Sequence, residues 1–393
     1  MAEELTYVIV TPYSIRKSRT GGIIARLISR TGLNLVRARM FAPSKELVES
    51  FAKTLVTDSD PRHRETQELI RGYVLTHFSP NPSAPADTET PRVMLLVFQG
   101  NDAAAKIRHV VGHIVNQRTS GETIRDTYGD YVTDANGKVV YFEPGVLAAP
   151  DAQSAESTLK LWARYSDTDG GLLSSTVHFP TEEKVEKTLV LIKPDNFRFP
   201  NSRPGGVIDV FSRTGLYIIG MKVHFMSVAQ ACEFYGPVLD VLKKVLRERT
   251  ANSVRAAIEQ QLDLTLDAEA MRALGDVLGP ISGQQHWESI IQFMAGSKPS
   301  DCLPEKRALP GSEKCIALVY QGVDAVRKIR EVLGPTDPSK APPGSIRKEF
   351  GQTIMVNAAH ASDAPENAQR EMKIVQIEEN NLKPFVESFY GGV

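Results

Sequence analysis

The chain has 393 residues, 41% of them hydrophobic and 24% charged, which is enough for two or three domains with buried cores. A formal net charge of -1 provides no overall field that would attract nucleic acid or an acidic membrane surface, so a nucleic-acid binder is disfavoured. Three cysteines without metal-ligand spacing are typical of a reducing compartment, and no signal segment or membrane-spanning apolar run is seen. We therefore expect a cytoplasmic protein.

The first elements occur in the same order in both halves of the chain. Each half begins with an apolar run typical of a strand, Tyr7–Val10 or Leu189–Ile192. A helical stretch follows and ends at a shared Ser-Arg-Thr-Gly-Leu segment, found at residues 29–33 and again 183 residues later at 212–216. Its glycine is typical of a helix stop. A second strand is then predicted at Leu33–Phe41 and at Leu216–Phe225.

The later elements repeat as well. A third strand is predicted at Val93–Phe98 and Cys315–Tyr320, each after a Pro-rich loop, 79–91 or 298–310. A shared Gln-Gly-x-Asp-Ala segment, a helix and a last strand follow, now with an offset of 222 residues. The sequence thus contains two copies of one domain.

The second copy carries 39 additional residues, because the offset grows from 183 to 222. They fall within about 241–283, where basic and apolar residues alternate at helical spacing and Asp267 is placed to cap a second helix. We interpret this insert as a lid over a ligand, an interface element or a solvated helical hairpin.

The order of elements predicts an α+β fold with two tandem ferredoxin-like βαββαβ sandwiches and antiparallel sheets. We expect one domain at 1–162 and a second at 187–393, the latter with the helical insert. The Asp-, Gly- and Ser-rich segment 163–186 is predicted to be the linker.

His360 is the candidate nucleophile. It follows a β-type run, Thr353–Val356, and precedes Asp363-Ala364-Pro365-Glu366, a pattern typical of a helix start. Glu371 lies about two turns into that helix, from which it can point back to the imidazole. A carboxylate on one ring nitrogen fixes the tautomer and leaves the other nitrogen to attack.

Several cations are expected around this histidine. Lys193 ends the first strand of the second copy, Arg330 lies at a helix end before Thr336, and Arg347 precedes the histidine segment. Such a group of cations is repulsive without an anion, but with a polyphosphate the arginines act as bidentate clamps. No Gly-x-x-x-x-Gly-Lys-Ser/Thr segment occurs, so a P-loop mechanism is not supported.

The second copy resembles nucleoside diphosphate kinases over residues 187–375, apart from the insert. The resemblance is carried by three motifs: Asn-x-x-His-x-Ser-Asp at 357–363, Lys-Pro-Asp at 193–195, and Gly-Ser-Ile-Arg at 344–347. It implies transfer of a γ-phosphoryl group from a nucleoside triphosphate to a nucleoside diphosphate by a ping-pong mechanism. His360 would be the phosphoacceptor and Glu371 would orient it. It also implies Mg²⁺ bridging the nucleotide phosphates and a ring-like homo-oligomer.

The resemblance assigns roles to the remaining site residues. Arg330, Thr336 and Arg347 would hold phosphates, and Lys193 and Asn357 would reach the sugar 3′ hydroxyl and phosphates. Tyr235 would support the phosphohistidine region, and Ser362 and Asp363 would shape its loop. The base would stack between Ile354 and the segment containing His286 and Ile290. This sequence departs from the family pattern at His286, where an aromatic ring is usual, and at Ala361, where glycine is common.

The first copy resembles the same family only as a scaffold. Thr11-Pro12-Tyr13 replaces Lys-Pro-Asp, whereas Arg108 and Arg125 persist. The segment that should carry the histidine, 143–150, contains none, and we place the position of the lost histidine at Ala148. We expect a structural role for this copy, such as replacing a subunit in the oligomer, with nucleotide sensing as the alternative. For the whole chain, the alternative to a kinase is a non-enzymatic nucleotide-binding or assembly protein.

Overall fold

The computed structural model describes residues 3–392 except 59, 61, 81–88, 115–120, 174 and 180–183. The chain forms two compact units. One comprises Met1–Val223 and Ile316–Val393, and the other comprises His224–Cys315. Each unit is described by itself.

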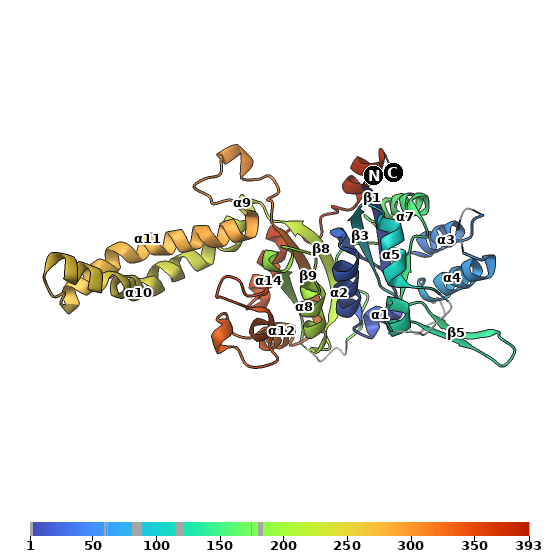
Figure 1. The fold of residues 1–393 in the computed structure, drawn as a ribbon, viewed down its shortest axis with the longest axis horizontal. Coiled ribbons are helices and arrows are strands. Elements are labelled where there is room, and N and C mark those ends of the chain that lie inside the picture. The colour runs from blue at the N-terminus through green and yellow to red at the C-terminus, as the bar shows by residue number, and fades with distance from the viewer. Residues whose placement is uncertain are drawn as a thin grey trace. The chain divides into compact units, whose positions relative to one another are not determined.

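The first unit contains two four-stranded sheets with the same strand order (Figure 1). One sheet has the order β2-β3-β1-β6, and the other, read in the same direction, β8-β9-β7-β10. The first is made of β1 (Glu4–Val10), β2 (Asn34–Phe41), β3 (Val93–Gly100) and β6 (Val146–Ala148). The second is made of β7 (Val185–Ile192), β8 (Tyr217–Phe225), β9 (Lys314–Val323) and β10 (Ala359–Ala361). The strand pairs with a defined register are antiparallel, which confirms the predicted fold class.

Two equivalent helices of the copies pack against each other, α2 (Thr20–Thr31) and α8 (Arg203–Ser212). Each begins with one glycine pair of the sequence repeat, and the first glycine of each pair lies at the contact. A Cβ atom on Gly21 would lie 2.4 Å from the Asp209 backbone nitrogen, and one on Gly205 would lie 2.2 Å from that of Ala25. Helix α2 ends at Gly32 in the left-handed region, as predicted for a glycine stop.

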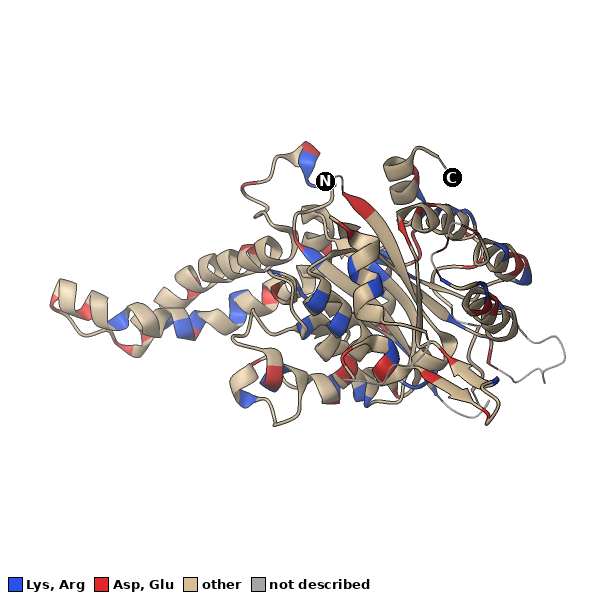
Figure 2. Ribbon diagram, turned by 45° about the vertical axis from the view of Figure 1, so that its right-hand side comes forward, with Lys and Arg blue, Asp and Glu red and all other residues tan. Residues whose placement is uncertain are grey.

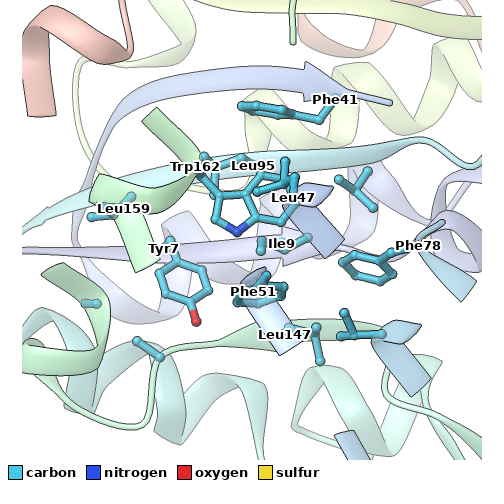
Figure 3. Packing of buried hydrophobic residues seen from close by; sticks show 14 of the residues in the cluster. Tyr7, Ile9, Phe41, Leu47, Phe51, Phe78, Leu95, Leu147, Leu159 and Trp162 are labelled. Atoms are coloured by element: carbon cyan, nitrogen blue, oxygen red, sulfur yellow. The ribbon is translucent and has the colours of Figure 1, made fainter. Parts of the chain in front are cut away.

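The core of the first copy lies between its sheet and a layer of helices. Trp162 packs edge-on against Phe41 and Phe51, and Tyr7 and Leu95 of the sheet lie beside it (Figure 3). Besides α2, the described residues of the first copy form a small hairpin and six helices: α1 (Pro12–Arg16), α3 (Lys45–Thr54), α4 (Arg64–His77), α5 (Ala103–Val111), α6 (Ile124–Tyr128), α7 (Ala152–Arg164), and the hairpin strands β4 (Asp130–Thr133) and β5 (Val139–Glu143).

The last helix of the chain completes this same core. Helix α15 (Lys383–Tyr390) packs against α7, and Leu382 and Val386 are buried among the residues of the first copy. Arg37 of β2 stacks on Phe385, with 4.0 Å between its guanidinium carbon and the ring centroid. The two chain ends therefore lie side by side (Figure 1), and Tyr390 donates a hydrogen bond to the Leu5 carbonyl.

The helices of the second copy that belong to the first unit carry the candidate site. Besides α8, they are α12 (Ala325–Leu333), α13 (Ile346–Phe350) and α14 (Pro365–Ile374), with 3-10 turns at Pro194–Asn196 and Pro338–Lys340. Helix α12 contacts both β7 and β10, and α14 contacts β7.

The second unit is dominated by a helical hairpin of α10 (Gly236–Leu262) and α11 (Ala268–Ala295). It also contains α9 (Val228–Phe234) and a 3-10 turn, Pro304–Lys306. Asp267 caps α11 by accepting a hydrogen bond from the Ala270 amide, as predicted. Acidic and basic side chains are interspersed along the hairpin (Figure 2). The two helices extend beyond 241–283 at both ends, so the hairpin is longer than the insert that the offsets indicate.

The segment 163–186 begins with the end of α7 and then runs along β2. Gly170 pairs with Phe41, and the Arg39 guanidinium donates to the Ser166 carbonyl at 3.1 Å. Residue 174 and residues 180–183 of this segment, and residues 81–88 of the first Pro-rich loop, lie outside the described residues. Among the described residues, no helix combines the length and the apolarity needed to cross a bilayer.

Candidate active site

His360 is held by a carboxylate that is itself fixed. Its Nε2 atom lies 2.9 Å from Oε2 of Glu371, and the Ser362 hydroxyl donates to the same oxygen at 2.6 Å. Arg370 lies 3.6 Å from the other oxygen, Oε1. The Glu371 side chain is only 6% exposed, whereas that of His360 is 24% exposed. Since Glu371 engages Nε2, the ring presents Nδ1 as the nitrogen for chemistry.

The backbone before His360 is strained and is held in place by several hydrogen bonds. His360 pairs with Leu191 in the β10–β7 ladder. Ala358 has a φ of 69°, a left-handed conformation that is uncommon for a residue with a Cβ atom. Its carbonyl accepts hydrogen bonds from the Lys193 amide at 2.9 Å and the Asn196 side chain at 2.8 Å, and its amide donates to Asp195 at 3.3 Å. The surrounding structure therefore fixes a conformation that is costly by itself.

Two local predictions around His360 are corrected by the structure. The run Thr353–Val356 is not a strand but a bend, in which the Gln352 amide donates to the Val356 carbonyl at 2.7 Å. The strand is Ala359–Ala361, so His360 lies within it. Helix α14 starts at Pro365 as expected, but its N-cap is Ala364, without a side-chain cap. The Asp363 carboxylate instead accepts from Asn367, and this hydrogen bond lowers the pKa of Asp363.

Lys193 and Asn357 form a buried polar pair beside the strained turn. The Lys193 ammonium donates to Asn357 Oδ1 at 2.9 Å and to the Met355 carbonyl. The Asn357 amide nitrogen donates to the carbonyls of Ile354 at 2.8 Å and Thr336 at 3.2 Å. Burial lowers the pKa of Lys193 to about 8, an effect that Asp195 opposes and the charge of Arg347 reinforces. The Ile354 side chain remains exposed.

The two arginines predicted to hold phosphates lie in this same unit. Arg347 donates to the carbonyls of Gly334 at 2.9 Å and Ala359 at 3.2 Å, which links α13 to the strand of His360. Arg330 is an exposed residue of α12, and both its charge and that of His360 contribute to the low pKa of Asp363. Hydrogen bonds thus link Lys193, Arg347, Thr336 and Asn357 to the segment of His360, and Arg330 acts on the same segment through its charge.

Three predicted site residues belong to the second unit. Tyr235 accepts a hydrogen bond at its carbonyl from the Trp287 indole at 2.9 Å. His286 is exposed on α11, where its Nδ1 atom lies 2.8 Å from the Ser282 carbonyl. Ile290 lies one turn further along that helix. The role of Tyr235 in supporting the phosphohistidine region, and those of His286 and Ile290 in base binding, stay predictions from the sequence.

The equivalent strand of the first copy carries an apolar residue where the second copy has His360. Leu147 pairs with Ile9 in the β6–β1 ladder, as His360 pairs with Leu191. Both positions lie five residues before the first residue of the next helix, Ala152 or Pro365. The position of the histidine is therefore Leu147 and not Ala148, because the register of the strand, rather than motif counting, sets the correspondence. The same alignment places buried Thr158 at the position of Glu371.

Polar groups also differ at the position of Lys193. In the first copy, the Thr11 hydroxyl donates to the buried Glu143 carboxylate at 2.9 Å, and the Tyr73 hydroxyl donates to it at 2.6 Å. Burial and the neighbouring Glu143 raise the pKa of Tyr73. Arg125, by contrast, keeps the same backbone partners as Arg347, donating to the carbonyls of Gly112 and Val146.

Sequence reasoning missed part of the support of Glu371. Ser362 was expected to shape the loop, but its hydroxyl bonds directly to the Glu371 carboxylate. Arg370, beside Glu371 in the chain, was not singled out although it pairs with the same carboxylate. The adjacent Arg-Glu pair is common on helix surfaces, so the sequence gives no signal that distinguishes this one.

Comparison with known proteins decides the family. Residues 281–380 match the family model described as nucleoside diphosphate kinase. A nucleoside diphosphate kinase of Cereibacter sphaeroides is 30% identical over 188 residues, which cover 48% of this chain and 91% of that protein. The chain belongs to the nucleoside diphosphate kinase family.

Other members of the nucleoside diphosphate kinase family give a similar coverage. The protein of Staphylothermus marinus with that name is 29% identical over 190 residues, which cover 48% of this chain and 92% of that protein. A crystal structure of the Aquifex aeolicus nucleoside diphosphate kinase covers 51% of this chain and 99% of its own, with 27% identity and a TM-score of 0.31. The sequence matches relate about half of this chain to a nearly full-length relative.

Proposed function

We propose that the chain transfers the γ-phosphoryl group of a nucleoside triphosphate to a nucleoside diphosphate through a phosphohistidine at His360. The contact of 2.9 Å between His360 Nε2 and Glu371 Oε2 carries this proposal. It fixes the ring so that Nδ1 is the attacking nitrogen, and the carboxylate stabilises the positive charge that develops on the ring. The relatives named nucleoside diphosphate kinase support the same reaction.

The proposed reaction has two balanced steps. In the first, the Nδ1 lone pair attacks the γ-phosphorus, a nitrogen–phosphorus bond forms, and the bond to the β-phosphate oxygen breaks, releasing a nucleoside diphosphate. In the second, a terminal oxygen of an acceptor diphosphate attacks the same phosphorus and the nitrogen–phosphorus bond breaks. Neither step needs a proton to leave Nε2, which keeps its hydrogen bond to Glu371. Alignment and charge stabilisation therefore provide the catalysis.

The cations around His360 would provide the charge stabilisation. We assign Arg330 and Arg347 to phosphate oxygens, with the Thr336 hydroxyl beside them. The pair of Lys193 and Asn357 is assigned to the sugar hydroxyl and the phosphates. Preorganised donors of this kind act without reorganisation during the reaction. Ile354, exposed next to Asn357, is assigned to the base.

Mg²⁺ would enter with the nucleotide. In the described parts of the chain, no group of three or more His, Cys, Asp or Glu side chains is arranged to hold a metal ion. We therefore assign the ion to the nucleotide phosphates, where it would neutralise their charge. The expected homo-oligomer and cytoplasmic location stay predictions from the sequence.

Intact-protein mass spectrometry tests the proposal. The chain is incubated with ATP and Mg²⁺, then with unlabelled diphosphate, alongside His360→Ala and a control, His178→Ala, which removes an exposed histidine elsewhere. We expect a gain of one phosphate in the wild type and in the control, reversed by the diphosphate, and no gain in His360→Ala. Equal phosphorylation of His360→Ala would refute the mechanism. Nucleotide binding without any phosphate gain would favour the non-enzymatic alternative.

A further inference from the structure

The first copy contains a cavity of about 630 Å³ with a basic lining. It lies where the segment before α4, helix α5 and the start of α6 meet the chain after β6. Its charged or titratable lining residues are three arginines and three histidines, namely Arg62, Arg108, Arg125, His63, His109 and His113. No aspartate or glutamate is among the described residues that line it.

Arg125 is the buried cation of this cavity. It is only 6% exposed, and its guanidinium donates to the carbonyls of Gly112 at 2.5 Å and Val146 at 3.3 Å. Its Nε atom has no hydrogen-bond partner among the described residues. Burial lowers the pKa of Arg125 to about 9, and the charge of Arg62 adds to this effect. A buried cation that faces a second cation is costly unless an anion compensates it.

The other two arginines differ in how far their charge is compensated. The Arg62 guanidinium is fixed by the buried Asp60, whose two carboxylate oxygens each lie 2.9 Å from Nε. Arg108 is exposed, and within the described part of the chain its guanidinium donates to a neutral group, the Pro150 carbonyl, at 3.0 Å. Asp60, which is not itself part of the lining, thus compensates one of the three lining arginines. Among the described residues no ion pair is formed by the other two, so an anion in the cavity would meet two uncompensated guanidinium groups.

We propose that this cavity binds the polyphosphate part of a ligand and performs no phosphoryl transfer. The volume falls in the range of small-molecule sites, roughly 300–1,000 Å³. Leu147 stands at the position of His360 and Thr158 at that of Glu371, so the counterparts of the second copy's nucleophile and of its orienting carboxylate are both missing. Among the described lining residues there is no Phe, Tyr or Trp, so the phosphates, rather than a base, are the recognised group.

Calorimetry with two ligands and the full-length chain tests this site. Tripolyphosphate and ATP are titrated without Mg²⁺ into four variants. The first is Arg330→Gln, which weakens the proposed active site, and two double variants combine it with Arg108→Gln or with Lys106→Gln. The fourth is Arg108→Gln alone. Lys106 is an exposed cation of the same helix, two residues from Arg108 and absent from the lining, so it controls for charge. Melting curves verify that each variant is folded.

We expect Arg330→Gln to retain one site for both ligands, with similar affinity for each. Adding Arg108→Gln should weaken that binding at least about tenfold, since a hydrogen bond to a charged group contributes about 1.5–3 kcal/mol. Adding Lys106→Gln should leave the affinity within about twofold, because exposed charges off the site contribute little. Three results would each overturn the proposal. Arg330→Gln could lose all binding, its remaining binding could be unchanged by adding Arg108→Gln, or it could bind ATP but not tripolyphosphate. None of these results bears on the phosphorylation of His360, which is measured separately in the wild type.

Discussion

Gly205 lies so close to Gly21 that a Cβ atom on Gly205 would stand 2.3 Å from the Gly21 carbonyl oxygen. The two glycines are equivalent members of the repeated Gly-Gly pair, and they meet where α2 and α8 pack. The packing of the two copies thus depends on backbone contact that only glycine permits.

Replacing Gly205 by alanine should therefore destabilise the first unit. The added methyl would meet the backbone of Gly21 and Ala25, which cannot move like a flexible side chain, and overpacking of this kind costs about 1–3 kcal/mol. Chemical denaturation measures the change in the free energy of unfolding. Gly72→Ala is the matched control, since Gly72 also lies in a helix but nothing lies within 4 Å of its Cβ position. The control should be stabilising by up to about 1 kcal/mol, and equal destabilisation of both variants would contradict the packing argument.

Glu371→Gln should slow phosphorylation of His360 while leaving the fold intact. The amide retains the shape but loses the charge that stabilises the imidazole as it becomes positive, and such a charged hydrogen bond contributes about 1.5–3 kcal/mol, or about tenfold or more in rate. Rapid-quench measurement of the phosphoenzyme checks this. Ser362→Ala removes only the hydroxyl that fixes Glu371 and should have a smaller effect. A larger loss in Ser362→Ala than in Glu371→Gln would show that the carboxylate does not act through its charge.

Nucleotide affinity should fall as the pH rises through about 8, the pKa to which burial lowers the Lys193 ammonium. Above that pH the side chain becomes neutral and loses its attraction for phosphate. In Lys193→Met this fall in affinity near pH 8 should be absent, and the nucleotide affinity should be low at every pH. Lys314, whose pKa burial also lowers to about 8, lies in the second unit and provides the control. If Lys314→Met abolishes the fall in affinity and Lys193→Met does not, the assignment of Lys193 to the phosphates is wrong.

Lys193 should also make the free energy of unfolding depend on pH, with a rise where the nucleotide affinity falls. Below about pH 8, Lys193 is protonated in both the folded and the unfolded chain and contributes no pH dependence. From about 8 to its ordinary value of 10.5, the unfolded chain binds the proton and the folded chain does not. The free energy of unfolding therefore rises with pH across this window. Denaturation of wild type and Lys193→Met at several pH values should show a steeper rise for the wild type, and parallel curves would contradict it.

Leu382→Ala should destabilise the first copy although Leu382 lies near the end of the chain. Its side chain is 1% exposed within the core of that copy, and truncation of a buried leucine costs about 2–5 kcal/mol. Hydrogen exchange should show the loss of protection in β1 and α7. Phe389→Ala, a change at an exposed position on the same helix, should have little effect. Loss of protection confined to α15 would contradict this interpretation.

The sequence was sufficient to predict the first three strands of each sheet and the pairing of His360 with Glu371. Strands and helix stops repeat in order, and two copies of one pattern support each other where a single copy would be ambiguous. The helical stop at Gly32 was correct because left-handed backbone favours glycine so strongly.

The strand predicted at Thr353–Val356 was wrong for a local reason. These residues have strand propensity, but the Asn357 side chain bonds back to the Ile354 carbonyl and holds the chain in a turn. Side-chain to backbone bonds of this kind compete with strand formation and leave no periodic signal. The shift from Ala148 to Leu147 has a different, long-range origin. The hairpin of β4 and β5 changes the chain length before the last strand of the first copy, and the pairing with Ile9 fixes the register.

The core of the first copy contains Leu382 and Val386, two residues that follow all strands of the second copy in the chain. A ribosome therefore makes them only after the second copy. The first copy, although its strands are synthesised first, cannot finish its core until the second copy has been made. Its completion thus departs from the amino-terminal-first order that is general for multidomain chains.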